Sequence, residues 1–409
     1  MAKDMNQTPG FHTRREILQQ GEMWLQTWKS VAAEAGAFRK FLSDRGLDKN
    51  SDILFCGAGS SEFAAQTVAD IFCAAGYTHV RSVPTTDIVT DPSYYVHPED
   101  TVLAFTFARS GNSPESAGAY EMLNRYCRKV YHVIVTCNKN GDMLRDASPE
   151  RDFKCILPDP TNDVSLVMTS SFSSMCMAAV LLSEPEAVDG KRALVEEAGR
   201  YAAAILDPAV QEKMKEIASR KISRVVVLGG GPLKGIAREC HLKMQEMTNG
   251  EIIAKYDTFL GLRHGPKAVI DEGTMVVYLL SDEAFSRRYE LDLMRQVALE
   301  HNPVAQIALS KAPIDEEGLK LDLQINAPEI SSFAENPLTF IVPVLIGQTM
   351  GYHLSVARGY NPDSPSRNGV ISRVVKGVRI YEPEIAHAGG RAYVRPAGGV
   401  FPEDPVRQD

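Results

Sequence analysis

The stretch from Val102 to Glu115, VLAFTFARSGNSPE, limits the possible folds of this chain more than any other. Its first six residues are nearly all apolar or β-branched, which is typical of a strand buried on both faces of a parallel sheet. A polar loop and then Pro114, a favoured first residue of a helix, come next; the loop residues are Arg109, Ser110, Gly111, Asn112 and Ser113. Free backbone N–H groups at a helix start can hold a phosphate or carboxylate. An ordinary turn rich in serine and glycine would show the same pattern.

Strands and helices alternate around this stretch from residue 51 to about 199, which predicts a doubly wound parallel sheet. The predicted strands are 53–56, 80–83, 102–107, 130–136 and 154–157, with helices near 61–75, 114–127 and 169–182. Ligands in such sheets bind outside the carboxyl ends of the strands. A dinucleotide fold is the competing interpretation, because Gly57-x-Gly59 opens like a nucleotide-binding turn. It is weakened by Glu62, which stands in place of the third glycine.

A second unit of the same kind begins after a helical linker around 190–220. A strand at 224–228, the turn Gly229-Gly-Gly-Pro232 and a helix to Gln245 repeat the order of 53–75, and further strands are predicted at 275–280, 304–309 and 321–325. A long apolar helix is expected over 338–354 and an irregular tail after Tyr381. We therefore predict an α/β chain of two sheet domains with an N-terminal helical segment; the boundaries are 1–46, 47–205, 206–382 and 383–409.

The N-terminal segment is expected to contain two helices. Thr13 and Glu16 have the spacing of a capping box that would open the first helix, and Phe38 and Leu42 belong to the second. Such a pair of helices serves packing or dimer contact more often than chemistry.

The composition of the chain argues against several kinds of binding partner. The net charge of −8 argues against a nucleic-acid partner, because binding to a phosphate backbone needs a basic face. No uninterrupted apolar run reaches about 18 residues and the N-terminus lacks a signal-peptide core, so we expect a cytoplasmic protein without a membrane partner. The 7 cysteines form no CxxC pair, which predicts buried free thiols, no disulfides and no metal site. No cofactor is expected either.

Three loops of the first unit together resemble the sugar isomerase, or SIS, phosphosugar-binding domain. They are Gly57-Ala-Gly-Ser60-Ser61, the loop after Val102–Phe107, and Ser165-Leu-Val-Met-Thr169-Ser170. The resemblance implies that these loops hold a sugar phosphate. The residues that would bind it are Ser60, Ser61, Arg109, Ser110, Asn112, Ser113, Thr169 and Ser170.

Three residues of the second unit are candidates for catalysis. Glu246 and the histidine of Leu262-Arg-His264-Gly-Pro266 resemble the catalytic pair of the glucosamine-6-phosphate synthase isomerase domain, and Lys376 resembles that family's imine-forming lysine. Moving a carbonyl between C1 and C2 requires a carboxylate that shuttles a proton and a group that opens the sugar ring. The alternatives are a solvated glutamate at a helix end, a turn histidine and a solvated lysine.

Nearly the whole chain resembles the galactosamine-6-phosphate deaminase/isomerase, or AgaS-type, family. The matching segments include Thr13-Arg-Arg-Glu-Ile17, Ala108–Glu115 and Thr161-Asn-Asp-x-Ser165. The resemblance implies conversion of galactosamine 6-phosphate to tagatose 6-phosphate with release of ammonia, by a homodimer or higher homo-oligomer. A phosphosugar aldose-ketose isomerase that releases no ammonia and a non-catalytic phosphosugar sensor remain alternatives. A sensor of this fold would carry a basic helix-turn-helix, and residues 1–50 show no such charge pattern.

Overall fold

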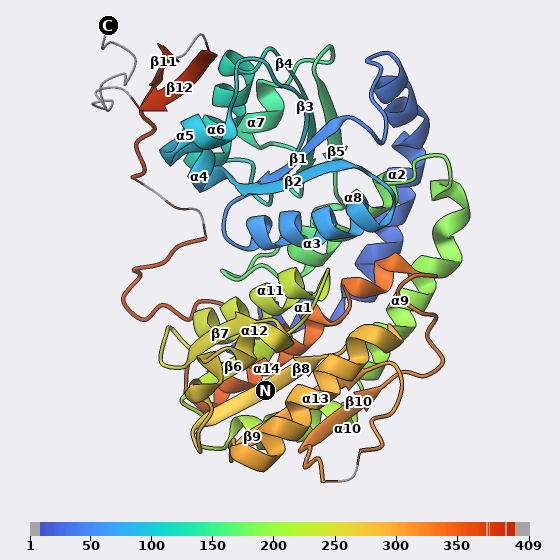
Figure 1. Ribbon diagram of the computed structural model, residues 1–409, viewed down its shortest axis with the longest axis vertical. Helices are drawn as coiled ribbons and strands as arrows, with labels where there is room; N and C mark the ends of the chain where they lie inside the picture. Colours follow the sequence, from blue (N-terminus) through green and yellow to red (C-terminus); the bar gives the residue numbers. More distant parts are fainter. Residues whose placement is uncertain (1–8, 317, 374, 376, 389–390, 397–409) are drawn as a thin grey trace, which may run out of the picture.

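The computed structural model describes residues 9–316, 318–373, 375, 377–388 and 391–396. It contains two five-stranded parallel sheets, each covered by helices on both faces, and a small two-stranded sheet near the C-terminus (Figure 1). The predicted fold class of two doubly wound α/β units is confirmed. We call the part that carries β1–β5 the first half and the part that carries β6–β10 the second half.

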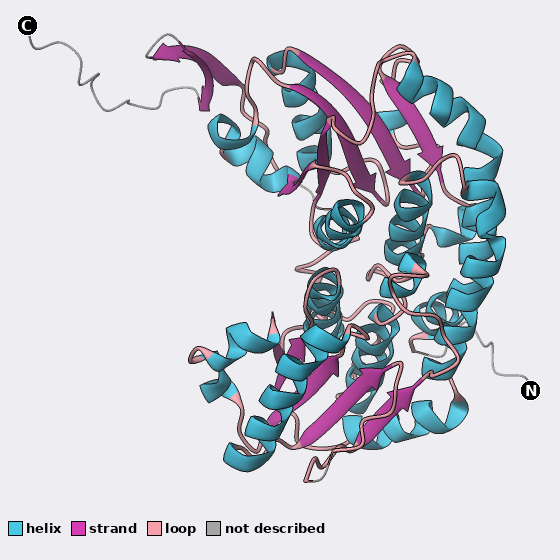
Figure 2. Ribbon diagram, turned by 45° about the vertical axis from the view of Figure 1, so that its right-hand side comes forward, coloured by secondary structure: helices cyan, strands magenta, loops and turns pink. Residues whose placement is uncertain are grey.

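The N-terminal helices run along one side of the molecule and reach both halves (Figure 2). They are α1 (Phe11–Leu18) and α2 (Gln20–Ser43), which are separated by Gln19. The predicted capping box is wrong. The N-cap of α1 is Gly10, and Thr13 donates through its backbone N–H and its hydroxyl to Asp363 at 2.7 and 2.8 Å. Glu16 instead binds a loop of the first half, as described below.

The first sheet has the order β2-β1-β3-β4-β5, with every neighbouring pair parallel. Phe55 of β1 lies opposite Phe105 of β3, and its ring centroid is 4.8 Å from that of Phe72 on the covering helix α3. The strands are β1 (Asp52–Gly57), β2 (His79–Pro84), β3 (Thr101–Ala108), β4 (Lys129–Thr136) and β5 (Asp152–Ile156). The helices are α3 (Ser60–Ala74), α4 (Thr85–Thr90), α5 (Pro92–Tyr95), α6 (Pro114–Tyr126), α7 (Asp142–Arg145), η2 (Asp159–Thr161) and α8 (Ser170–Leu182).

The second sheet repeats this order from the other edge, β10-β9-β8-β6-β7, so that β6 corresponds to β1 and β8 to β3. Its strands are β6 (Arg224–Leu228), β7 (Ile253–Asp257), β8 (Thr274–Leu279), β9 (Ala305–Ser310) and β10 (Leu323–Asn326). Its helices are α11 (Leu233–Met247), α12 (Phe259–Arg263), η4 (Pro266–Val269), α13 (Ala284–Glu300), η5 (Pro337–Phe340) and α14 (Val344–Ala357). The linking helices are η3 (Val188–Lys191), α9 (Arg192–Ile205) and α10 (Pro208–Ala218).

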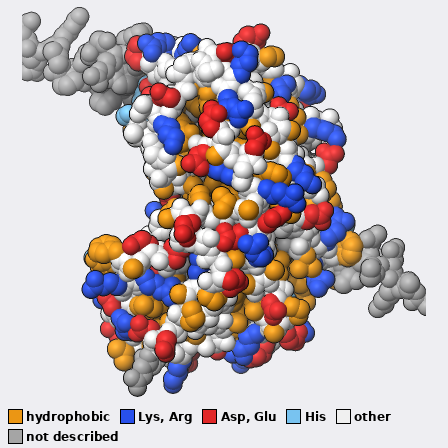
Figure 3. Space-filling view, turned by 90° about the vertical axis from the view of Figure 1, so that its right-hand side faces the viewer, with side chains coloured by type: hydrophobic (Ala, Val, Ile, Leu, Met, Phe, Trp, Pro, Cys, Tyr) orange, Lys and Arg blue, Asp and Glu red, His pale blue; other side chains and the backbone are white. Residues whose placement is uncertain are grey.

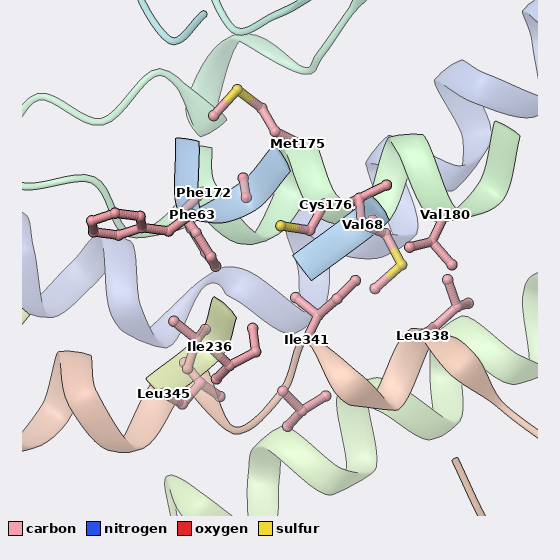
Figure 4. Packing of buried hydrophobic residues seen from close by; sticks show 14 of the residues in the cluster. Phe63, Val68, Phe172, Met175, Cys176, Val180, Ile236, Leu338, Ile341 and Leu345 are labelled. Carbon is pink, nitrogen blue, oxygen red and sulfur yellow. The ribbon is translucent and has the colours of Figure 1, made fainter. Parts of the chain in front are cut away.

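The two halves share one hydrophobic core. Figure 4 shows side chains of α3 and α8 facing side chains of α11, η5 and α14; the labelled residues are Phe63, Val68, Phe172, Met175, Cys176, Val180, Ile236, Leu338, Ile341 and Leu345. Glycine lets the helices approach closely, since a Cβ on Gly235 would lie 2.2 Å from the Thr67 hydroxyl and one on Gly347 would lie 2.3 Å from the Cα of Cys240. The approach at Gly235, which joins α11 to α3, fixes the position of one half on the other, and the approach at Gly347 packs α14 on α11 within the second half.

Several predicted details are wrong. The 338–354 helix is two elements, η5 and α14, because Pro343 interrupts the chain between them. The tail is not irregular throughout, since β11 (Pro383–Ala388) and β12 (Arg391–Pro396) pair antiparallel. Strand β7 was not predicted, and Cys73 is exposed whereas the other cysteines are buried.

One described stretch, Pro337–Ala357, has the length and hydropathy of a membrane-crossing helix. However, 72% of its most apolar window is buried inside the protein, where α14 packs against α11. The face in Figure 3 intersperses acidic and basic side chains and shows no broad basic area.

Candidate functional site

The candidate site lies where the two halves meet, beside the start of α3. Ser60 begins α3 directly after β1, and its hydroxyl accepts a hydrogen bond from Lys243 Nζ of α11 at 3.1 Å. Farther along α3, Thr67 lies against Gly235, so the two helices run antiparallel and the start of α3 meets the end of α11. The positive end of one helix dipole therefore faces the carboxylates carried by the last turns of the other.

Lys243 links two carboxylates on one face of α11. Its Nζ lies 2.9 Å from Oε2 of Glu246 and 3.2 Å from Oε1 of Glu239. Lys243 and Glu239 are fully buried, whereas the Glu246 side chain is 22% exposed and is therefore the one of the three that solvent reaches. Glu246, the predicted base, is thus held by a buried ammonium group.

Burial and charge set the protonation of this cluster. Burial raises the pKa of Glu239 to about 7, with the Lys243 charge opposing and the Glu246 charge reinforcing that rise. Burial alone would lower the pKa of Lys243, but the two carboxylates raise it above its ordinary value. Lys243 therefore stays protonated and supplies a fixed positive charge beside Glu246.

The loop after β3 forms a second wall. Gly111 adopts a φ of +67° and lies against Gly141, where a Cβ would come within 3.1 Å of the Gly141 Cα. Asn112 is exposed and accepts from the Asp142 N–H at 2.9 Å, while Ser113 donates to Glu115 Oε2 at 2.6 Å. The Ser110 hydroxyl is half-buried and accepts from the Asn112 N–H at 3.3 Å. The loop is thus shaped by its own contacts, with its hydroxyls at the helix start of α6.

Arg109 does not point into open space. It is 7% exposed, and its guanidinium donates to the Leu166 and Arg373 carbonyls, both at 2.9 Å. Burial lowers the pKa of Arg109, while the carboxylates of Asp163 and Glu246 act in the opposite direction. Arg109 thus joins the β3 loop to Leu166 and to the segment that follows α14.

Thr169 and Ser170, at the start of α8, are occupied by protein groups. Both backbone N–H groups and the Thr169 hydroxyl donate to the Asp163 carboxylate at 2.8–3.1 Å. The Ser170 hydroxyl donates to the Glu16 carbonyl at 2.7 Å and accepts from Gln19 at 2.9 Å. Asp163 thus fills the anion position of α8, whereas Ser60, Ser61, Ser110, Asn112 and Ser113 lie at the two other helix starts.

The candidate His264 lies apart from this cluster. His264 follows α12 on an exposed turn, and no contact among the described residues joins its side chain to Glu246. Behind it, only Ile270 of the apolar segment 268–270 is buried. Lys376 lies outside the described residues.

Sequence reasoning missed Glu239, Lys243 and Asp163. The spacing Glu239-x3-Lys243-x2-Glu246 places all three charges on one helix face, and this signal was available in the sequence. Asp163 gave no comparable signal, because its role depends on the return of the chain to the start of α8.

Comparisons with known proteins agree with this geometry. The SIS domain model matches residues 46–184. D-galactosamine-6-phosphate deaminase AgaS of Escherichia coli is 32% identical, over 91% of this chain and 96% of that protein. The protein of the same name from Shewanella sp. (strain ANA-3) is 31% identical, over 93% of this chain and 94% of that protein. This chain belongs to the AgaS family.

Structure supports the same membership. The crystal structure described as tagatose-6-phosphate ketose/aldose isomerase from Escherichia coli has a TM-score of 0.80 and 29% identity, covering 93% of this chain and 98% of that chain. The AgaS family assignment therefore extends over both halves and the N-terminal helices, beyond the segment that the SIS model matches.

Proposed function

We propose that this chain converts galactosamine 6-phosphate to tagatose 6-phosphate and ammonia. The observation that carries the proposal is the Ser60–Lys243–Glu246 contact, which places a carboxylate of the second half at a helix start of the first half. The names of the AgaS relatives supply the substrate class.

The substrate phosphate is assigned to the starts of α3 and α6. Ser61 and Ser60 at α3, and Ser110, Asn112 and Ser113 before α6, offer hydroxyl, amide and backbone donors there. Arg109 contributes positive charge from behind the loop. Thr169 and Ser170 support the site through Asp163, because that carboxylate already takes their N–H groups.

The proposed reaction begins with transfer of a proton from C2 of the sugar to C1. With the ring open, Glu246 removes the C2 proton of the amino aldose to give an enolamine, and reprotonation at C1 leaves an imine at C2. Water adds to the imine carbon, and the nitrogen leaves as ammonia to give the ketose 6-phosphate. Lys243 remains charged and holds Glu246 in place throughout.

His264 is assigned to ring opening and Lys376 to transient imine formation with the sugar. Because His264 is exposed in the single chain, we place it in the cleft of a second copy within a homodimer. Mixing Glu246→Gln and His264→Ala subunits tests this assignment. Activity that returns in the mixture supports a shared site, and two inactive parents with an inactive mixture contradict it.

The decisive experiment measures ammonium release from a panel of hexosamine 6-phosphates with purified protein. We expect stoichiometric ammonium and ketose 6-phosphate from galactosamine 6-phosphate. The second candidate function is the aldose-ketose isomerisation named for the Escherichia coli structure. Interconversion of tagatose 6-phosphate with its aldose, without ammonium from any amino sugar, would establish that alternative and refute deamination.

A further inference from the structure

The N-terminal helix α1 contacts the site through one buried carboxylate. Glu16 is 1% exposed, and its Oε1 accepts from the backbone N–H groups of Val164 and Ser165 at 2.6 and 3.3 Å. The Ser165 hydroxyl donates to the other oxygen of the same carboxylate. All of these donors belong to the loop between η2 and α8.

A second carboxylate holds the same loop from inside. Asp163 accepts from the N–H groups of Thr169, Ser170 and Ser171 at 2.8–3.1 Å. Burial raises the pKa of Glu16 to about 7, and the nearby Asp163 charge adds to the rise. The stretch from Asp163 to the start of α8 is therefore held from two sides, by Glu16 through the Val164 and Ser165 N–H groups and by Asp163 through the first N–H groups of α8.

The opposite side of this loop binds the segment that follows α14. Arg373 donates from Nε to the Asp163 carbonyl at 2.9 Å and from Nη2 to Asn162 Oδ1 at 2.5 Å. Arg109 bridges the loop and this segment, since it donates to the Leu166 and Arg373 carbonyls. These bonds tie the connection between α14 and β11 to the rim of the site, three residues before Lys376 in the sequence.

The connection is also held near its start, where the Asp363 carbonyl accepts from the Leu166 N–H at 3.0 Å and the Asp363 carboxylate accepts from Thr13. The described residues around Arg373 are exposed, including Val370 at 81% and Val375 at 53%, whereas Ile380 farther along lies against Val89 and Gly118. The arginine contacts therefore hold the middle of the connection, between Asp363 and Ile380, against the 162–166 loop.

We propose that Glu16 is a positioning residue, which shapes the 162–166 loop so that Arg109 and Arg373 anchor the connecting segment at the site. The consequence for turnover rests on the proposed function; the anchoring itself does not. Glu16 touches no reacting group, and its effect passes through Arg373.

The test compares Glu16→Ala, Arg373→Ala, their double variant and Glu16→Gln, which retains an acceptor for the N–H groups. Tryptic cleavage after Arg367 and Arg379 reports release of the connecting segment, while cleavage after the exposed Arg263 reports general loosening. We expect Glu16→Ala and Arg373→Ala each to accelerate the first two cleavages about tenfold, and the double variant no further. Glu16→Gln should restore most of the protection.

Glu22→Gln, on an exposed position of α2, is the matched control and should leave the cleavage rates unchanged.

Turnover supplies the second readout. The kcat/KM for galactosamine 6-phosphate should fall about tenfold in each single variant and no further in the double variant. Additive effects, or unchanged cleavage after Arg367 and Arg379 with faster cleavage after Arg263, would show that Glu16 only stabilises the fold. If Glu16→Ala does not fold, the Arg373→Ala variant is the test of the anchor. Unchanged cleavage after Arg367 and Arg379 in that variant would refute the anchor. Coupled cleavage in a protein that releases no ammonium would refute the proposed function and leave the anchor standing.

Discussion

The loops after β3 and β8 occupy the same position in the two sheets, but the helices that follow them begin with different N-cap groups. Strand β3 of the first half and strand β8 of the second half lie beside β1 and β6, respectively, and each leads through a short loop into a helix. In the first half the N-cap of α6 is Ser113, which makes no side-chain cap hydrogen bond among the described residues. In the second half the N-cap of α13 is Glu283, whose carboxylate accepts from the Ser286 N–H at 2.8 Å.

Charged side chains of the protein itself occupy the loop after β8. The Ser281 N–H donates to Glu290 at 3.0 Å, and Asp282 lies 3.1 Å from the ammonium of Lys311, which is 5% exposed. A helix start that already holds a carboxylate has less to offer an external phosphate. Under the proposed function the duplicated fold would separate two tasks: a helix start of the first half would hold the phosphate, and the second half would supply the catalytic carboxylate, Glu246.

The variant Glu246→Gln should have the largest effect, because it removes the carboxylate that the second half is proposed to supply. The amide keeps the shape but cannot accept the C2 proton, so kcat should fall by about two to four powers of ten while phosphosugar binding is nearly unchanged. Washout of deuterium from C2-labelled substrate is the measurement. Loss of the label at the native rate would mean that Glu246 is not the base.

The phosphate assignment predicts the next largest effect. Ser110→Ala and Ser113→Ala should each raise KM about 10- to 100-fold, because a hydrogen bond to a charged group contributes about 1.5–3 kcal/mol. The double variant should raise KM more than either, with little change in kcat. Ser281→Ala, at the corresponding loop of the second half, is the control and should leave KM unchanged. Equal effects in the two halves would contradict the comparison.

The buried carboxylate behind the β8 loop predicts a pH dependence of stability. Burial raises the pKa of Glu290 to about 7, against an ordinary value of 4.5, so the native state binds the extra proton between these two pH values. Its contribution to stability is fully present below pH 4.5 and is lost as the pH rises through 7, by at most about 1.4 kcal/mol per pH unit. Urea unfolding of the native protein and Glu290→Gln across this window checks the slope. Identical slopes would show that Glu290 titrates normally.

The smallest effect concerns the α13 cap. Glu283→Ala should lower the free energy of unfolding by about 0.5–2 kcal/mol, because a helix-start N–H loses its acceptor. The KM for the phosphosugar should not change, because the proposed function assigns the phosphate to the starts of α3 and α6. Denaturant unfolding and steady-state kinetics measure the two quantities. A raised KM would place phosphate in the second half.

Sequence alone determined the alternation of strands and helices, the duplication, and the loops at the carboxyl ends of β1 and β3. These features are local: apolar periodicity defines a strand, and Gly, Ser and Pro define the turn and helix start that follow it. The Glu239, Lys243 and Glu246 spacing was equally readable, because a helix repeats every 3.6 residues and places the three on one face.

Tertiary structure decided which of these groups meet. Thr13 and Glu16 have the spacing of a capping box. In the structure, however, Thr13 donates to Asp363, and Glu16 accepts from the 164–165 loop. Thr169 and Ser170 fit a phosphate loop, yet Asp163 occupies their N–H groups. Likewise, Ser60 and Lys243 are 183 residues apart in sequence and meet only because glycine lets α3 and α11 pack closely. Partners brought together by chain topology leave no periodic signal in a single sequence, because their spacing is set by the packing of the two halves and not by the repeat of one helix or strand.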